Sequence, residues 1–133
     1  MTSITEKTLK DLEFATVLEA IASGCVTEPG QQKALEIKPF RDRETLMDAL
    51  QQTSEYVSSF ENNNALPNHG FEPVHNELKF LAIEDSYLDA PAFRKIGALA
   101  ETVATLIKFL AKFDDYYPTL HLRASAVEYR KEI

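Results

Sequence analysis

The stretch TEPGQQKALEIKPFRDRETLMDALQQTSEY, residues 27–56, contains the start signals of two consecutive helices. Thr27 can cap the first helix, because its hydroxyl can accept a hydrogen bond from a free backbone N–H. Pro29 fits the first turn, where the N–H groups have no partner within the helix. Pro39 disfavours helical torsions at Lys38 and predicts that the helix ends there. Asp42 is expected to cap the second helix.

Gly30 is the unexpected residue of this stretch. A glycine inside a helix costs about 1 kcal/mol relative to alanine. Its presence therefore predicts a close approach of another element or a non-helical backbone torsion. The neighbour that we expect Gly30 to approach lies partly beyond Ile133.

The helix that Asp42 caps has apolar side chains on one face over four turns. These positions are Leu46, Leu50, Thr53, Val57 and Phe60. The run Asn62–Asn64 is expected to end this helix, since asparagine tolerates the left-handed conformation. The following residues, up to Phe71, are rich in Asn, Pro and Gly and predict a loop.

Three further helices are predicted on the two sides of this region. A first helix, with a possible break near residues 12–16 and an end near Gly24, places four side chains on one face: Phe14, Leu18, Ile21 and Cys25. A short helix has Pro73 in its first turn. The longest helix is capped by Asp89 with Pro91 in its first turn.

The longest helix has a heptad-like apolar pattern with spacings of 3, 4, 3, 4 and 3. The pattern consists of Ile96, Leu99, Val103, Leu106, Leu110 and Phe113. It is too short to require a dimeric coiled coil, and a seam within an intramolecular bundle is the favoured interpretation.

A last helical stripe is formed by Leu122, Ala126, Tyr129 and Ile133. It reaches the end of the sequence without a capping residue, so we expect a truncated last helix. The sequence as a whole predicts an all-α fold, an irregular bundle of about five to six helices. Residues 1–133 are expected to form one N-terminal segment of a larger protein.

The composition limits the classes of function. The net charge of −7 argues against strong binding of nucleic acid by this segment alone, because such binding depends on Lys and Arg neutralising phosphates. No run approaches the roughly 20 apolar residues of a membrane span. The charged N-terminus is unlike a signal peptide. We expect a cytoplasmic protein without a membrane association.

The sequence contains no complete catalytic, cofactor-binding or metal-binding motif. The three histidines, His69, His75 and His121, are far apart, and the four glycines form no phosphate-binding loop. Cys25, the single cysteine, is interpreted as a small buried hydrophobe on a helix. The adjacent acidic pairs are interpreted as solvated helix ends, and the aromatic run near Tyr116 as a packed helix end rather than a base-stacking platform.

Residues 27–56 resemble the helical core of MutS-type proteins. The shared pattern is Thr-x-x-Gly, an apolar patch, Pro-x-x-Asp and a long helix with an apolar residue in every turn. The preceding EKTLKDLEFATVLEAIASGCVT, residues 6–27, is similar to the short N-terminal lead of the second MutS branch, the MutS-two proteins. The later LPNHGF, the long helix and ASAVEYRKEI follow in similar order, so the resemblance covers essentially the whole chain.

The resemblance implies a parent protein that is a dimeric, DNA-associated ATPase and endonuclease. Such proteins suppress recombination on branched DNA or rescue collided ribosomes, and they require ATP and Mg²⁺. No catalytic residue is carried over, since this chain contains none of the family's ATPase, clamp or nuclease motifs. The residues that we assign a structural role are Thr27, Pro29, Gly30, Pro39 and Asp42. The alternative is a free-standing helical adaptor that binds a partner through the Ile96–Phe113 stripe.

Overall fold

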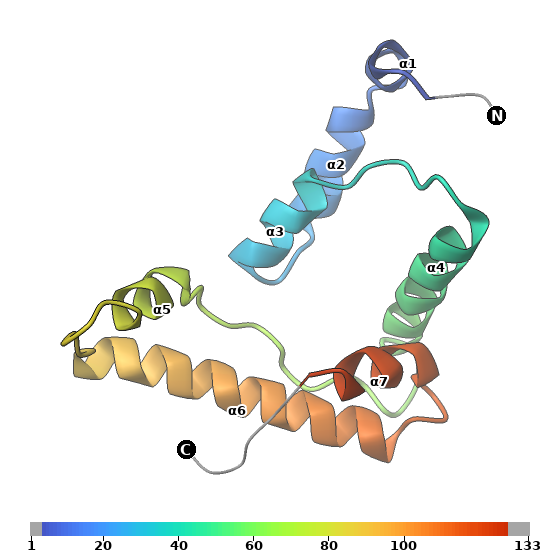
Figure 1. The fold of residues 1–133 in the computed structure, drawn as a ribbon. Helices are drawn as coiled ribbons and strands as arrows, with labels where there is room; N and C mark the ends of the chain where they lie inside the picture. The colour runs from blue at the N-terminus through green and yellow to red at the C-terminus, as the bar shows by residue number, and fades with distance from the viewer. Residues whose placement is uncertain (1–3, 128–133) are drawn as a thin grey trace.

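The computed structural model describes residues 4–127, which form seven α-helices and no β-strand (Figure 1). The expected all-α, irregular bundle is confirmed. In chain order the helices are α1 (Glu6–Asp11), α2 (Phe14–Ser23), α3 (Glu28–Leu35), α4 (Arg43–Ser58), α5 (His75–Leu81), α6 (Ala90–Lys112) and α7 (Pro118–Ser125).

Side-chain caps fix the starts of four described helices, α1 with Thr5 and the three helices α3, α4 and α6 at the residues that the sequence predicts. The Oγ1 atom of Thr27 accepts a hydrogen bond from the N–H of Gly30 at 3.1 Å at the start of α3. Asp42 accepts from the N–H of Thr45 at 2.7 Å at the start of α4. Asp89 caps α6 in the same way, with Pro91 in its first turn. Each cap satisfies an N–H that has no partner within its helix.

The break considered near residues 12–16 is present, because Glu13 between α1 and α2 has a left-handed φ of 51°. Two other helix boundaries differ from the expectation. Helix α3 ends at Leu35 rather than near Lys38. The N–H groups of Glu36 and Ile37 bind the carbonyls three residues earlier instead of four, so the α-helical pattern stops there. Helix α5 begins at His75, so Pro73 precedes the helix instead of lying in its first turn.

Helix α7 ends at Ser125, and Ala126 is its C-terminal cap residue. The predicted stripe therefore continues past the end of the helix. Its last two members, Tyr129 and Ile133, lie outside the described residues, and so does the predicted truncation at the end of the chain.

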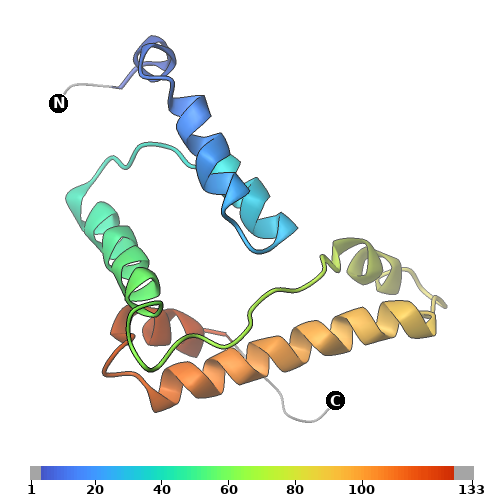
Figure 2. The same ribbon diagram turned by 180° about the vertical axis from the view of Figure 1, so that it is seen from behind.

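Helix α6 is the longest element, with α5 near its N-terminal half and α7 near its C-terminal half (Figures 1 and 2). The helix pairs with substantial contact are α1 with α2, α2 with α3, α4 with α7, and α6 with α7. The ion pair between Lys95 of α6 and Glu77 of α5, at 2.6 Å, joins a further pair. The predicted seam of α6 is half-buried and is most buried at Leu110.

Tyr117 is the most deeply buried large side chain, with 0% of its surface exposed. It lies between α6 and α7, where its ring stacks at a tilt on Phe109. Its hydroxyl donates a hydrogen bond to the backbone carbonyl of Asn64 and accepts one from the side-chain amide of Asn62 at 3.1 Å. One tyrosine thus ties the loop after α4 to the α6–α7 corner.

The fold leaves much apolar surface open. The accessible surface is 10870 Å², about one and a half times that of a compact protein of the same mass. Few apolar side chains are buried in residues 4–127: Leu18, Ala22, Ala34, Val74, Ala104, Leu110 and Tyr117. The helices are therefore held together as much by specific polar contacts as by a continuous core.

Gly30 has no positive φ, so the non-helical torsion considered for it is excluded. A side chain there would bring its Cβ to 3.0 Å from Oγ1 of Thr27 and 3.7 Å from Cβ of Cys25. The close neighbour in the described residues is thus the turn before α3 and its capping hydroxyl. A contact with residues beyond Ile133 remains a prediction.

Replacing Tyr117 with Phe should lower the free energy of unfolding by about 1–2 kcal/mol, since the buried carbonyl of Asn64 and the amide of Asn62 lose their partner. Denaturant unfolding measures the change. The matched control is Tyr116→Phe, at a neighbouring ring that is 54% exposed. Equal stability of the two variants would contradict the role of the Tyr117 hydroxyl.

Replacing Gly30 with Val should lower the free energy of unfolding by about 1–3 kcal/mol, because the new side chain crowds the Thr27 cap. The same substitution at Gly97, where nothing lies within 4 Å of the added Cβ, should change stability little. The two melting midpoints are compared by circular dichroism. An unchanged midpoint for Gly30→Val would remove the tight contact from the account.

Candidate functional site

The junction of α4 and α7 is built around one buried carboxylate. Glu55 of α4 is 3% exposed. Its two oxygens accept hydrogen bonds from the backbone N–H groups of Thr119 and Leu120, each at 2.9 Å. These N–H groups belong to the first turn of α7, whose own cap residue, Tyr117, makes no side-chain capping bond. Glu55 therefore caps a helix that lies more than sixty residues away in the sequence.

Electrostatics favour the ionised form of Glu55. Burial raises the pKa of the carboxyl. The hydrogen bonds from the N–H groups of Leu120 and Thr119 lower the pKa by more than burial raises it, so the pKa lies below its ordinary value of 4.5. The positive end of the α7 dipole acts in the same direction. The charge is thus stabilised by directed donors although it is removed from water.

A second polar contact continues the junction along α4. The carboxylate of Asp48 binds the guanidinium of Arg123 on α7 at 2.7 Å and accepts a hydrogen bond from Gln52 at 2.6 Å. The Arg123 guanidinium lowers the pKa of Asp48. The hydroxyl of Ser59, which is also buried on this side, donates to the carbonyl of Tyr56. Helix α4 thus meets α7 with polar side chains.

The apolar face predicted for α4 is not in the core. At 100° per residue, its positions lie on the side of the helix opposite to Glu55 and Ser59. All five predicted positions are exposed: Leu46, Leu50, Thr53, Val57 and Phe60. We call these five residues the α4 seam. Periodicity identified correctly which residues share this face. In the structure the face points outward.

The five residues given a structural role from the sequence lie in three different places in the fold. Thr27, Pro29 and Gly30 form the first turn of α3, where α3 packs on α2. Pro39 lies in the connection after α3, and Asp42 starts α4. Thr27 and Asp42 cap the starts of their helices, and the five residues do not converge on a common site.

Cys25 is not on a helix, contrary to expectation. It lies half-buried in the turn between α2 and α3, and its Sγ atom donates to the carbonyl of Ile21 at 3.4 Å. Within residues 4–127 the hydrogen-bond partner of Sγ is thus a carbonyl and not a base that could activate the thiol.

His69, in the loop after α4, has polar partners, and the described residues form no metal-binding cluster. His69 contacts the hydroxyl of Tyr56 through Nε2 at 3.1 Å and the carbonyl of Pro67 through Nδ1 at 3.0 Å. Within residues 4–127, no group of three or more His, Cys, Asp or Glu side chains has a metal-binding arrangement. No described helix is both long and apolar enough to cross a bilayer.

The aromatic run at the end of α6 is a packed corner. Phe113 stacks on Phe109 with a centroid distance of 4.8 Å, and Tyr117 is inaccessible. Of Phe113, Tyr116 and Tyr117, Tyr116 alone is largely exposed, which agrees with the packed helix end expected from the sequence. A platform of successive exposed rings is therefore absent at this corner.

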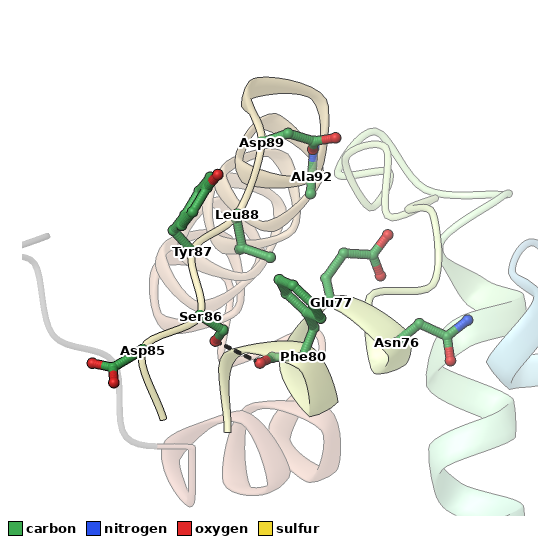
Figure 3. Close-up of a pocket in the computed structure, with 9 residues that line it drawn as sticks. All are labelled: Asn76, Glu77, Phe80, Asp85, Ser86, Tyr87, Leu88, Asp89 and Ala92. Atoms are coloured by element: carbon green, nitrogen blue, oxygen red, sulfur yellow. Dashed lines mark hydrogen bonds between the residues drawn. The ribbon is translucent and has the colours of Figure 1, made fainter. Parts of the chain in front are cut away.

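A shallow pocket of about 540 Å³ lies between α5 and the start of α6 (Figure 3). Two of its three carboxylates already have structural partners, since Asp89 caps α6 and Glu77 pairs with Lys95. The carboxylate of Asp85 points away from the other two in Figure 3. The pocket therefore lacks the converging polar groups of an active site.

Sequence reasoning missed the two residues that organise the site, Glu55 and Tyr117. The pattern around Glu55 gave no signal of burial, because an acid on the side opposite to the apolar stripe is expected to face solvent. Its partners at Thr119 and Leu120 have no local signature. Tyr117 directly precedes Pro118 at a helix start, which signals a corner but not burial.

Known proteins with a similar sequence carry the name Endonuclease MutS2. The protein from Pediococcus pentosaceus is 30% identical over 110 residues, and those from Lacticaseibacillus casei and Lactobacillus helveticus are 27% and 26% identical. Each alignment covers 83% of this chain, which spans about 14% of the length of these relatives. No protein-family model and no solved structure matches the chain. The chain thus resembles a region of MutS2 endonucleases along most of its length.

Replacing Glu55 with Gln should lower the free energy of unfolding by about 1–3 kcal/mol at pH 7, because two charge-assisted hydrogen bonds are weakened. The pKa of Glu55 is lowered on folding, so its contribution is present above pH 4.5 and is lost as the pH falls through the folded-state pKa. The difference in the free energy of unfolding between the wild type and Glu55→Gln should therefore become smaller as the pH is lowered.

Urea unfolding at several pH values between 3 and 7 tests this result. The matched control is Glu101→Gln, on an exposed position of α6, which should follow the wild type throughout. A gap for Glu55→Gln that is absent at pH 7, or that stays constant down to pH 3, would contradict the anchor.

Proposed function

We propose that this chain is a structural, non-catalytic helical segment of a MutS-family protein that acts in DNA repair. In this proposal it corresponds to the N-terminal core and lever region of the second MutS branch. The observation that carries the proposal is the similarity to MutS2 endonucleases over 83% of the chain. The order of elements expected for that family from the sequence supports the same assignment.

The geometry supports a mechanical role. Helix α6 runs for 23 residues, and the Glu55 anchor and Tyr117 fix its C-terminal end to α7 and α4. A rigid lever needs such directed contacts, and it needs no reactive groups. The large open apolar surface suits a segment that other parts of a longer protein cover.

The parent protein in this proposal is an ATPase and endonuclease whose catalytic domains lie in other parts of the chain. ATP and Mg²⁺ are bound there, and nucleotide state is transmitted through the helices to a clamp on nucleic acid. The parent is proposed to be a cytoplasmic homodimer that suppresses recombination on branched DNA or acts on stalled ribosomes. The segment by itself binds nucleic acid weakly or not at all, in keeping with its net charge of −7.

The adaptor alternative changes in the light of the fold. The Ile96–Phe113 stripe is half-buried in the bundle, whereas the α4 seam is exposed. A free-standing adaptor would therefore use α4 rather than α6 as its contact helix.

Reading the gene beyond the codon for Ile133 tests the proposed function. We expect an open frame that continues to a GxxxxGK[ST] phosphate-binding motif, the feature an ATPase requires. The longer product should hydrolyse ATP, while the 133-residue chain should not. A stop codon directly after Ile133 would overturn the proposal and leave the adaptor.

A further inference from the structure

The helices of the described chain form two groups. Helix α2 contacts α1 and α3, whereas α7 contacts α4 and α6, and the ion pair of Glu77 with Lys95 adds α5 to the second group. Within residues 4–127, no pair of helices in substantial contact takes one member from each group. Both views show α1–α3 together, joined to α4 by an extended segment (Figures 1 and 2). We call α1–α3 the arm and α4–α7 the frame.

Polar contacts are divided in the same way. Each side-chain hydrogen bond and ion pair of the described chain lies either within residues 5–30 or within residues 42–125. Each group also has buried apolar side chains of its own: Leu18, Ala22 and Ala34 in the arm, and Val74, Ala104, Leu110 and Tyr117 in the frame. Among the described residues, the directed contacts that orient helices within each group are therefore absent between the groups.

The segment between α3 and α4, residues 37–42, has the properties of a hinge. It contains no helix, and all of its residues except Pro39 are exposed. Within the described chain, residues 38–41 make no hydrogen bond. Hinges consist of a few loop residues, or residues at the ends of helices, whose backbone torsions can change without breaking other contacts.

The loop between α4 and α5 touches the arm at Gly70. A Cβ atom at this glycine would lie 3.2 Å from Cγ1 of Val26, in the turn between α2 and α3, so the loop backbone lies directly against that side chain. The loop itself is held by the frame, since Tyr117 binds its first residues and His69 binds Tyr56 of α4. Val26 remains 57% exposed, so this contact buries little apolar surface.

We infer that the arm pivots about residues 37–42 and that the loop after α4 is its latch, through the contact of Gly70 with Val26. When this contact opens, the arm swings away as one unit, because α2 keeps its contacts with α1 and α3. The frame keeps its arrangement, because the contacts of Glu55 and Tyr117 lie within it. A small contact leaves the two positions close in free energy, so both are populated. The inference uses only contacts within the chain and is independent of the proposed function.

Distances between two spin labels, measured by pulsed electron paramagnetic resonance on the 133-residue chain, test the inference. The labels are attached to introduced cysteines after Cys25→Ser, in which a hydroxyl can still donate to the carbonyl of Ile21. The arm–frame pair combines Glu19→Cys on α2 with Glu101→Cys on α6. The frame pair combines Ser54→Cys on α4 with the same position on α6. All three labelled positions are exposed.

Gly70→Val should open the latch, because the added side chain meets Val26. We expect the undocked fraction, seen in the arm–frame distance, to rise from about 10% or less in the wild type to the larger part of the molecules. Val26→Asp should have the same effect from the arm side, since it places a charge at the contact. The matched control is Gly97→Val, where nothing lies within 4 Å of the added Cβ, and it should keep the wild-type distribution.

The frame distance should stay the same in all of these variants, and circular dichroism checks that they remain helical. Because Val26 is exposed, Val26→Asp keeps the test available if Gly70→Val disturbs the loop. An arm–frame distance that keeps its docked value in both variants would overturn the inference. A wild-type distribution already as broad as theirs would also overturn it, since Gly70 would then be no latch. So would a frame distance that broadens together with the arm–frame distance, because the whole bundle would then be loosening.

Discussion

The two hydrogen bonds from the first turn of α7 to the Glu55 carboxylate are the constraint on which the rest of the arrangement depends. A carboxylate that is removed from water must be matched by donors, and the free N–H groups at a helix start are well suited to this. Because α7 supplies them, the side of α4 that carries Glu55 has to face inward. The apolar side of α4 then faces outward, against the usual preference.

The same constraint places the neighbouring elements. Once α7 is held against α4, the α6–α7 corner lies beside the loop after α4, where the Tyr117 hydroxyl reaches Asn62 and Asn64. Polar contacts thus specify the arrangement where the apolar core is small. Their fixed geometry gives a defined orientation between helices, which non-directional burial alone would specify less sharply.

Local signals in the sequence predicted most of the helices and little of their assembly. The caps at Thr27, Asp42 and Asp89 were predictable, because a side chain satisfies an N–H only three residues ahead. The orientation of α4 was not, since periodicity identifies an apolar face but not its neighbour. Glu55 and its two donors are 64 and 65 residues apart, and no local rule connects them. The end of α3 and the start of α5 differ from the prediction by a few residues, because boundaries of helices are the least sharply specified part of the pattern.

The central claim is that α7 holds Glu55 as a buried anion, and an NMR titration of the side-chain carboxyl carbons tests it most directly. The account predicts that Glu55 titrates below its ordinary value of 4.5, because the two backbone N–H donors outweigh the effect of burial. Exposed glutamates in the same spectrum provide the reference. A midpoint for Glu55 at or above 4.5 would mean that burial outweighs the donors. The anchor, and with it the outward direction of the α4 seam, would then be contradicted.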